Sequence, residues 1–224
     1  MPKNFEKWWS KNLFGSEDYY LHKGKKYKTP SLDEFSNQWM GSIDDPDRKL
    51  VREYIVKFST VLDVGCGGSP EYYGLKKIKA NIEYTGLDIT PELVDLNLKN
   101  NINCVVGSAN DIPFDNSSFE VVHSRHVIEH MEDFKKPMLE FIRVAEKCVL
   151  ISFFMGPDYR LKTDWIPKKS KISLDNKGST GEIYHNRYSM YEIRRFLNRQ
   201  NKVKNFNYIS LLNHSTYLLK IDLY

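Results

Sequence analysis

The sequence has little cysteine, no long apolar run and no strong excess of charge of either sign. Its three cysteines, Cys66, Cys104 and Cys148, form neither an even disulfide set nor a Cys-x-x-Cys metal pair. The longest mainly apolar run, 149–155, is far shorter than the roughly 20 residues that cross a bilayer, and the N-terminus lacks the apolar core of a signal peptide. These absences predict a cytoplasmic protein with reduced thiols and no membrane association.

The charge balance also limits the function. The 33 lysines and arginines against 29 acidic residues give a formal net charge of +4, too small to indicate a dedicated nucleic-acid-binding protein. A length of 224 residues with 41% hydrophobic residues suits one α/β domain with a small appendage. We expect the appendage at 1–44, an aromatic and basic cap segment, and the domain at 45–224.

Helix and strand patterns alternate from Asp45, which precedes a proline at the first helical position. Helices are predicted at 46–58, 71–78, 91–99, 134–145 and 190–201, and strands at 61–64, 84–89, 104–106, 119–123, 148–155, 203–212 and 216–224. The last two strands are joined by a short loop and should pair antiparallel. The pattern predicts a doubly wound, Rossmann-like, mostly parallel seven-stranded sheet with helices on both faces and a C-terminal antiparallel hairpin. Its ligand should lie at the carboxyl ends of the strands.

The first strand ends in VLDVGCGGSP, where glycines follow an acid. Gly65 and Gly67 allow positive φ angles and let the backbone lie against a ligand. A dinucleotide fingerprint would require glycine at position 70, where the chain has Pro70, so NAD is disfavoured. The second strand ends in Asp88, which is placed to accept both hydrogen bonds of a ribose diol. These residues predict a nucleoside ligand whose other end is cationic or carries an amine.

Several motifs in order resemble one family. They are LDVGCGG at 62–68, YTGLDIT at 84–90, VVGSANDIPFDNSSFEVVHSRHVIEHMED at 105–133, and the terminal hairpin. The chain thus resembles the class I S-adenosylmethionine-dependent methyltransferases, and among them the type 11 small-molecule group. The resemblance covers about 45–224 and implies S-adenosylmethionine as the cofactor.

The resemblance also implies roles for individual residues. The methionine part of the cofactor would lie along Asp63, Gly65, Cys66 and Gly67, and its amine would face Ser124. Asp88 would hold the ribose. The adenine would contact Ile89, Ser108, Ala109 and Asn110. The chain departs from the family at Ser69, where a third glycine is common, and at Ser108, where an acid is common. The second change removes one adenine contact, for which Asn110 or Asp111 is an available substitute.

Histidines are the candidate catalytic bases, since a base is needed only for an acceptor that is still protonated. His126 follows the fourth strand, and His185 lies in the variable substrate region. His126 and His130 are four residues apart and should share one face of a helix, with His130 fixing the loop. No acid or cysteine completes a metal set around them.

The prediction of the acceptor depends on two motifs that are missing after the fourth strand. Position 123–126 reads HSRH, without the (Asp/Asn)-Pro-Pro-(Tyr/Phe) of amino-methylating DNA and protein enzymes or the Pro-Cys of cytosine-C5 enzymes. We expect a small-molecule or glycan acceptor, methylated at oxygen, covered by the cap and by an insertion at 156–188. The lysine clusters at 23–28 and 168–171 suit either an anionic acceptor or a solvated surface. Two alternatives are an RNA methyltransferase and a non-catalytic S-adenosylmethionine-binding partner protein.

Overall fold

The computed structural model describes residues 43–131, 133–153, 186–210 and 217–224, together with short strands at 19–22, 25–28, 170–173 and 180–183. Most of the predicted cap and of the predicted insertion therefore lies outside the described residues. Among the described helices, none combines the length and the apolar character that a bilayer-spanning helix needs.

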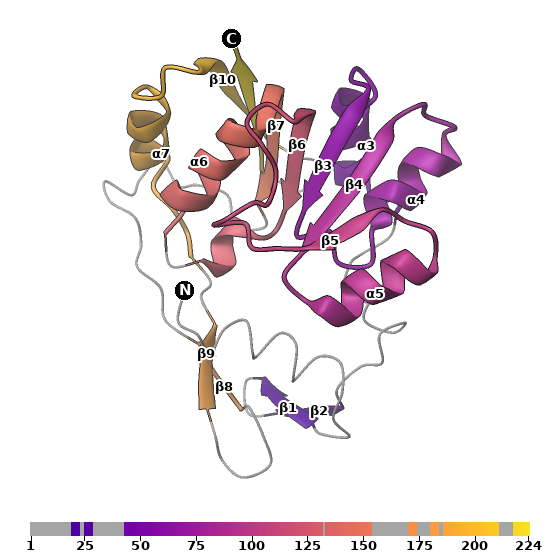
Figure 1. Ribbon diagram of the computed structural model, residues 1–224. Helices are drawn as coiled ribbons and strands as arrows, with labels where there is room; N and C mark the ends of the chain where they lie inside the picture. Colours follow the sequence, from indigo (N-terminus) through magenta and orange to yellow (C-terminus); the bar gives the residue numbers. More distant parts are fainter. Residues whose placement is uncertain are drawn as a thin grey trace.

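A seven-stranded mixed sheet forms the centre of the molecule (Figure 1). Its strands are β3 (Thr60–Val64), β4 (Glu83–Asp88), β5 (Cys104–Val106), β6 (Phe119–Arg125), β7 (Ala145–Phe153), β10 (Val203–Ser210) and β11 (Tyr217–Leu223). Their order is β10-β11-β7-β6-β3-β4-β5, with β3 to β7 parallel and β11 antiparallel to both β7 and β10. The predicted doubly wound sheet and its terminal hairpin are confirmed.

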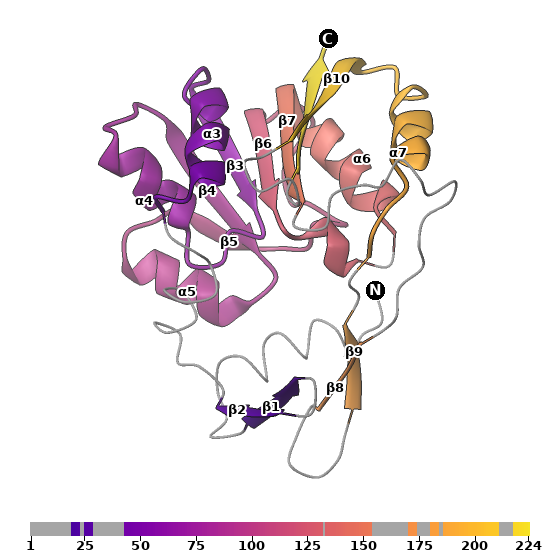
Figure 2. The same ribbon diagram turned by 180° about the vertical axis from the view of Figure 1, so that it is seen from behind.

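Helices cover both faces of this sheet (Figures 1 and 2). They are α3 (Pro46–Ile55), α4 (Pro70–Lys77), α5 (Pro91–Lys99), α6 (Lys135–Val144) and α7 (Met190–Leu197). Proline opens α3, α4 and α5, where its missing N–H costs nothing. Ser189 caps the N-terminus of α7, because its side chain accepts from the Glu192 N–H at 3.4 Å. Asp45 and Thr90, by contrast, make no side-chain cap bond.

Alternation along the strands divides the core into two layers. Leu62 and Val64 face the layer under α6 and α7, whereas Val61 faces the layer under α3 and α4. Because side chains alternate along a strand, Asp63 shares the face of Val61. The second layer therefore contains a buried carboxylate close to the carboxyl end of β3.

Two short hairpins lie beyond the edge of the sheet. They are β1 (Tyr19–His22) with β2 (Lys25–Lys28), and β8 (Ser170–Ser173) with β9 (Thr180–Ile183). Strand β1 contacts β8. Figures 1 and 2 both show the hairpins on the side where β3 and β4 end.

The segment after β6 is not the helix that the histidine spacing predicts. Strand β6 continues to Arg125, His126 has a left-handed φ of 59°, and only a short 3-10 turn, η2 (Ile128–His130), follows. The N–H of His126 donates to the carbonyl of Ser152 on β7 at 2.9 Å, so His126 remains tied to the sheet. The prediction that His126 and His130 share one helical face is therefore wrong.

Candidate cofactor site

The glycine turn after β3 has the predicted backbone conformation. Gly65 and Gly67 have φ angles of 73° and 54°. The N–H groups of Gly65 and Cys66 both donate to the carbonyl of Leu87, at 2.7 and 3.1 Å. A Cβ on Gly65 would lie 2.3 Å from Cγ2 of Val127. The turn is therefore held between the end of β4 and the segment after β6, where a side chain at position 65 does not fit.

The carboxylate of Asp88 is fixed by two backbone amides. Its Oδ2 accepts from the N–H of Gly67 and its Oδ1 from the N–H of Thr90, each at 2.9 Å. Burial raises the pKa of Asp88, and the Thr90 and Gly67 hydrogen bonds oppose this rise. Each carboxylate oxygen keeps a further lone pair. The oriented acceptors fit a ribose diol, so the residues present suit a nucleoside cofactor.

Asp63 joins three strands. Its Oδ2 accepts from the hydroxyl of Tyr84 on β4 at 2.8 Å, and its Oδ1 lies 2.8 Å from Nδ1 of His123 on β6. Burial and the Asp63 charge raise the pKa of Tyr84 well above its usual value. Sequence reasoning missed Tyr84 and His123; the register of β3 with both neighbouring strands was the missing information.

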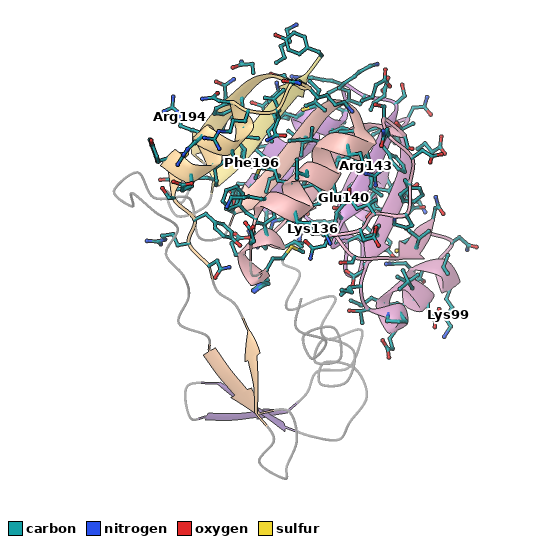
Figure 3. All side chains as sticks on the ribbon, turned by 60° about the vertical axis from the view of Figure 1, so that its left-hand side comes forward. Lys99, Lys136, Glu140, Arg143, Arg194 and Phe196 are labelled. Carbon is teal, nitrogen blue, oxygen red and sulfur yellow. The ribbon has the colours of Figure 1, made fainter. Side chains whose placement is uncertain are left out.

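The predicted adenine loop follows β5 and is held by α6. Ser108 Oγ accepts from the N–H of Asn110 at 3.2 Å, and Ala109 is buried. Glu140 accepts from the N–H of Ile112 at 2.9 Å, while Arg143 donates to the carbonyl of Ile112 at 2.9 Å. Figure 3 shows Glu140 and Arg143 on α6. This helix therefore keeps the loop close to the end of the sheet.

The last two predicted cofactor residues, Ser124 and Ile89, also lie near the carboxyl ends of strands. Ser124, near the end of β6, donates its hydroxyl proton to the carbonyl of Val64 at 3.0 Å. Ile89 follows β4 and is half-buried. The ten predicted cofactor residues thus come from the ends of four adjacent parallel strands, β3, β4, β5 and β6, and their individual contacts with a cofactor stay predictions.

Two cysteines that the sequence did not pair lie together behind the glycine turn. Cys66 and Cys104 are free thiols with their Sγ atoms 3.5 Å apart. The Cys104 hydrogen bond and burial raise the pKa of Cys66 well above its usual value, so this thiol stays protonated at neutral pH. The side-chain amide of Asn97 donates to the carbonyl of Gly67 at 2.7 Å and braces the turn.

Of the two predicted catalytic histidines, the structure describes only His126. Burial, followed by the charges of Arg125 and Arg48, lowers the pKa of His126 to about 2. His126 is therefore neutral at neutral pH and a weak base in this environment. His185 lies outside the described residues. Within the described ranges, no three His, Cys, Asp or Glu side chains are grouped to hold a metal ion.

Replacing Gly65 with alanine should weaken binding of S-adenosylhomocysteine, the demethylated cofactor, at least about 5-fold. The new Cβ meets Val127 at a positive φ, so the turn must move, at a cost of about 1–3 kcal/mol. Calorimetric titration measures the change. Ser69→Gly is the matched control in the same turn: Ser69 has a φ of 55°, which glycine adopts without strain, so binding should persist. Wild-type affinity in Gly65→Ala would contradict the geometry.

Replacing His126 with asparagine should make stability less dependent on pH. The depressed pKa of His126 means that the unfolded chain binds a proton below pH 6.5 that the folded chain does not, so stability is lost as pH falls. This one group accounts for a loss of about 2 kcal/mol between pH 7.5 and 5. Asparagine tolerates the left-handed backbone. Urea unfolding at both pH values should show the smaller loss in the variant, and parallel curves would overturn the assignment.

Comparisons with known proteins show what part of this chain is similar to a described family. Residues 62–151 match a family described as a methyltransferase domain, of type 11. The range begins in β3 and ends in β7, so it includes the glycine turn, Asp88 and the loop after β5.

Two named proteins are similar in sequence to part of this chain. Ajmaline N-methyltransferase of Rauvolfia serpentina is 34% identical over 110 residues, which cover 46% of this chain and 35% of that protein. Demethylmenaquinone methyltransferase of Chlorobaculum tepidum is 35% identical over 88 residues, covering 38% and 36%. The match thus spans about a third of the length of these relatives.

Solved structures resemble the fold over most of the chain. A S-adenosylmethionine-dependent methyltransferase of Methanosarcina mazei has a TM-score of 0.57 at 16% identity and covers 78% of this chain and 96% of its own. One from Aquifex aeolicus has a TM-score of 0.58 at 16% identity, covering 86% and 97%. Residues 62–151 therefore match the type 11 methyltransferase family, and the chain has the fold of these S-adenosylmethionine-dependent methyltransferase structures.

Proposed function

We propose that the protein transfers a methyl group from S-adenosylmethionine to a small-molecule or glycan acceptor, at an oxygen atom. The observation that carries the proposal is the buried Asp88 carboxylate, fixed by the Gly67 and Thr90 amides at the carboxyl edge of the sheet. The names of the relatives include an N-methyltransferase and a demethylmenaquinone methyltransferase, which supports a small-molecule acceptor.

The residues of the chain would bind and orient the reactants. When bound, S-adenosylmethionine supplies an activated methyl group on a sulfonium, so the protein must align the acceptor and exclude water. Asp88 would hold the ribose hydroxyls, and the turn at 65–67 would lie along the methionine part. Ser124 would present its backbone to the methionine amine, since its own hydroxyl is bonded to Val64.

Methylation of a hydroxyl oxygen requires a group that accepts the hydroxyl proton. A hydroxyl loses its proton as the methyl group arrives, and His126, just past the end of β6, is the described residue proposed to accept it. The arginines that lower its pKa to about 2 make it a weak base. An anion beside Arg125 would raise this pKa and make His126 a better base. His185 is the second proposed base.

The acceptor is proposed to bind beyond the carboxyl edge, between the domain and the segments that flank it in sequence. Both short hairpins lie on that side of the sheet (Figures 1 and 2), and they come from the cap region, 1–44, and the insertion, 156–188. In this proposal the cap, 1–44, and the insertion, 156–188, cover the acceptor.

The test measures the S-adenosylhomocysteine that forms when the protein is incubated with S-adenosylmethionine and one acceptor class at a time. The acceptor classes are phenols, hydroxy acids, sugars, amines and single-stranded RNA. The proposal expects turnover with hydroxylated small molecules or sugars. Turnover with amines alone would overturn the oxygen assignment, and turnover with RNA alone would make the protein a nucleic-acid enzyme. Cofactor binding without turnover on any panel would favour the non-catalytic alternative.

A further inference from the structure

Arg125 and Ser152 face each other at the carboxyl ends of two neighbouring strands. The two residues are register partners in the parallel pair of β6 and β7. Partners in a parallel pair project from the same face of the sheet. For this pair it is the face of Val121 and Leu150, covered by α3 and α4.

Among the described residues, the guanidinium of Arg125 has one distant carboxylate and no hydrogen-bond partner. Its side chain is 17% exposed, and the nearest carboxylate oxygen is Oδ2 of Asp45, 3.9 Å from Nη2. The structure gives it no hydrogen bond to any residue in the described ranges, although a guanidinium has five N–H donors. Buried charges are normally paired and hydrogen-bonded, so this group is ready to bind an anion.

Ser152 gives an independent indication at the same place. Its residue is 2% exposed, and its hydroxyl has no hydrogen-bond partner among the described residues. Buried hydroxyls without a partner are rare, and each points to a group that is missing from the site. A donor hydroxyl beside a guanidinium is a suitable pair for the oxygens of one anion.

Charges of both signs surround Arg125, and the strongest single one is the cation of Arg48. Arg48 and Arg52 are buried and share one buried carboxylate, Glu71. Burial and the charge of Arg48 lower the pKa of Arg125 to about 10. The charges of Glu71, Asp45 and Asp47 oppose this lowering, and Asp45 is more exposed than Arg125 and lies at the limit of an ion pair. An anion bound at Arg125 would offset the repulsion between its guanidinium and that of Arg48.

We propose that Arg125 and Ser152 bind an oxyanion of the acceptor, a carboxylate or a phosphate, and that the acceptor is therefore acidic. This rests on the proposed function, because the anion belongs to the molecule that receives the methyl group. Two guanidinium N–H groups donate to the two oxygens, and the Ser152 hydroxyl donates to one of them. Arg125 lies between Ser124 and His126, so the anion anchors the acceptor next to the proposed methionine subsite.

The test uses saturation-transfer NMR with matched fragments: benzoic acid and benzamide, 4-hydroxybenzoic acid and its amide, and phenyl phosphate with phenol. The protein is wild type, Arg125→Met, Ser152→Ala, or Arg194→Met as the control; Arg194 is exposed on α7 (Figure 3). Wild type and Arg194→Met should bind the anions at least 10-fold more tightly than their neutral partners. Arg125→Met should bring each pair within 2-fold, and Ser152→Ala should weaken the anions 3-fold or more.

Calorimetry with S-adenosylhomocysteine on the same samples separates the two proposals. The anion proposal expects the affinity of Arg125→Met to lie within 2-fold of wild type. A 10-fold loss would assign the arginine to the carboxylate of the methyl donor and overturn the proposal. Equal binding of anions and neutral partners by wild type, no fragment binding, or anion preference retained in Arg125→Met would each overturn it as well. Failure of wild type to bind S-adenosylhomocysteine would instead overturn the proposed function.

Thermal unfolding gives a readout independent of any ligand. Arg125 has no hydrogen bond in the described part of the chain, so its desolvation is not offset, and Arg125→Met should unfold at the wild-type temperature or above it. A structural arginine would show the opposite change, and a fall in the unfolding temperature of 5 °C or more would contradict the binding role.

Discussion

Replacing Asp88 with alanine should weaken binding of S-adenosylhomocysteine about 100-fold or more while the protein stays folded. The carboxylate is proposed to accept two hydrogen bonds from the ribose, and hydrogen bonds to a charged group contribute about 1.5–3 kcal/mol each. The variant also removes the acceptors of the Gly67 and Thr90 amides, so the turn keeps only its backbone bonds to Leu87 of β4. Calorimetric titration of both proteins measures the ratio.

The control for this substitution is Asp95→Ala. Asp95 is an exposed aspartate on the neighbouring helix α5, so its removal changes the net charge equally without touching the turn. Binding by Asp95→Ala should match wild type within 2-fold. A folded Asp88→Ala protein with wild-type affinity would show that the nucleoside does not bind at this carboxylate.

Replacing Glu71 with alanine should cost about 3–5 kcal/mol of unfolding free energy, the largest stability effect that we expect. Glu71 is buried, with Oε1 2.5 Å from Nη1 of Arg48 and Oε2 3.0 Å from Nη1 of Arg52. Both arginines are buried as well, so the variant leaves two guanidinium groups without their shared carboxylate. Urea unfolding monitored by circular dichroism gives the value.

Glu53→Ala is the matched control for Glu71. Glu53 is exposed on α3, the helix that carries both arginines, and its removal should change stability by less than about 0.5 kcal/mol. A loss below about 1 kcal/mol for Glu71→Ala would mean that the arginines find other acceptors. The ion pairs would then not be what holds α3 against α4.

The fold and the glycine turn could be predicted because their signals are local. Apolar runs separated by helix patterns are sufficient to predict a parallel sheet, and only glycine adopts the positive φ of Gly65 and Gly67 without strain. The roles of the predicted cofactor residues come from the family resemblance, and the topology brings these residues to one edge because parallel strands end there. Their spatial proximity therefore required no knowledge of side-chain contacts.

The buried polar groups could not be predicted, because each depends on a partner far away in the chain. In the helix at 46–55, Arg48 and Arg52 would be expected to face solvent, yet Glu71 holds both in the interior. The pair of Asp63 and His123 depends on strand register across 60 residues. The failure at His126 has the same cause, since a carbonyl of β7 binds its N–H and prevents the helix that its spacing with His130 suggests.

The central claim is that the edge formed by β3, β4, β5 and β6 binds the cofactor of this family. Calorimetric titration of the wild-type protein with S-adenosylhomocysteine, beside NAD, tests it most directly. The geometry at Gly65, Gly67 and Asp88 predicts one site of micromolar affinity for S-adenosylhomocysteine and no measurable binding of NAD. Absence of S-adenosylhomocysteine binding, or tighter binding of NAD, would contradict the account.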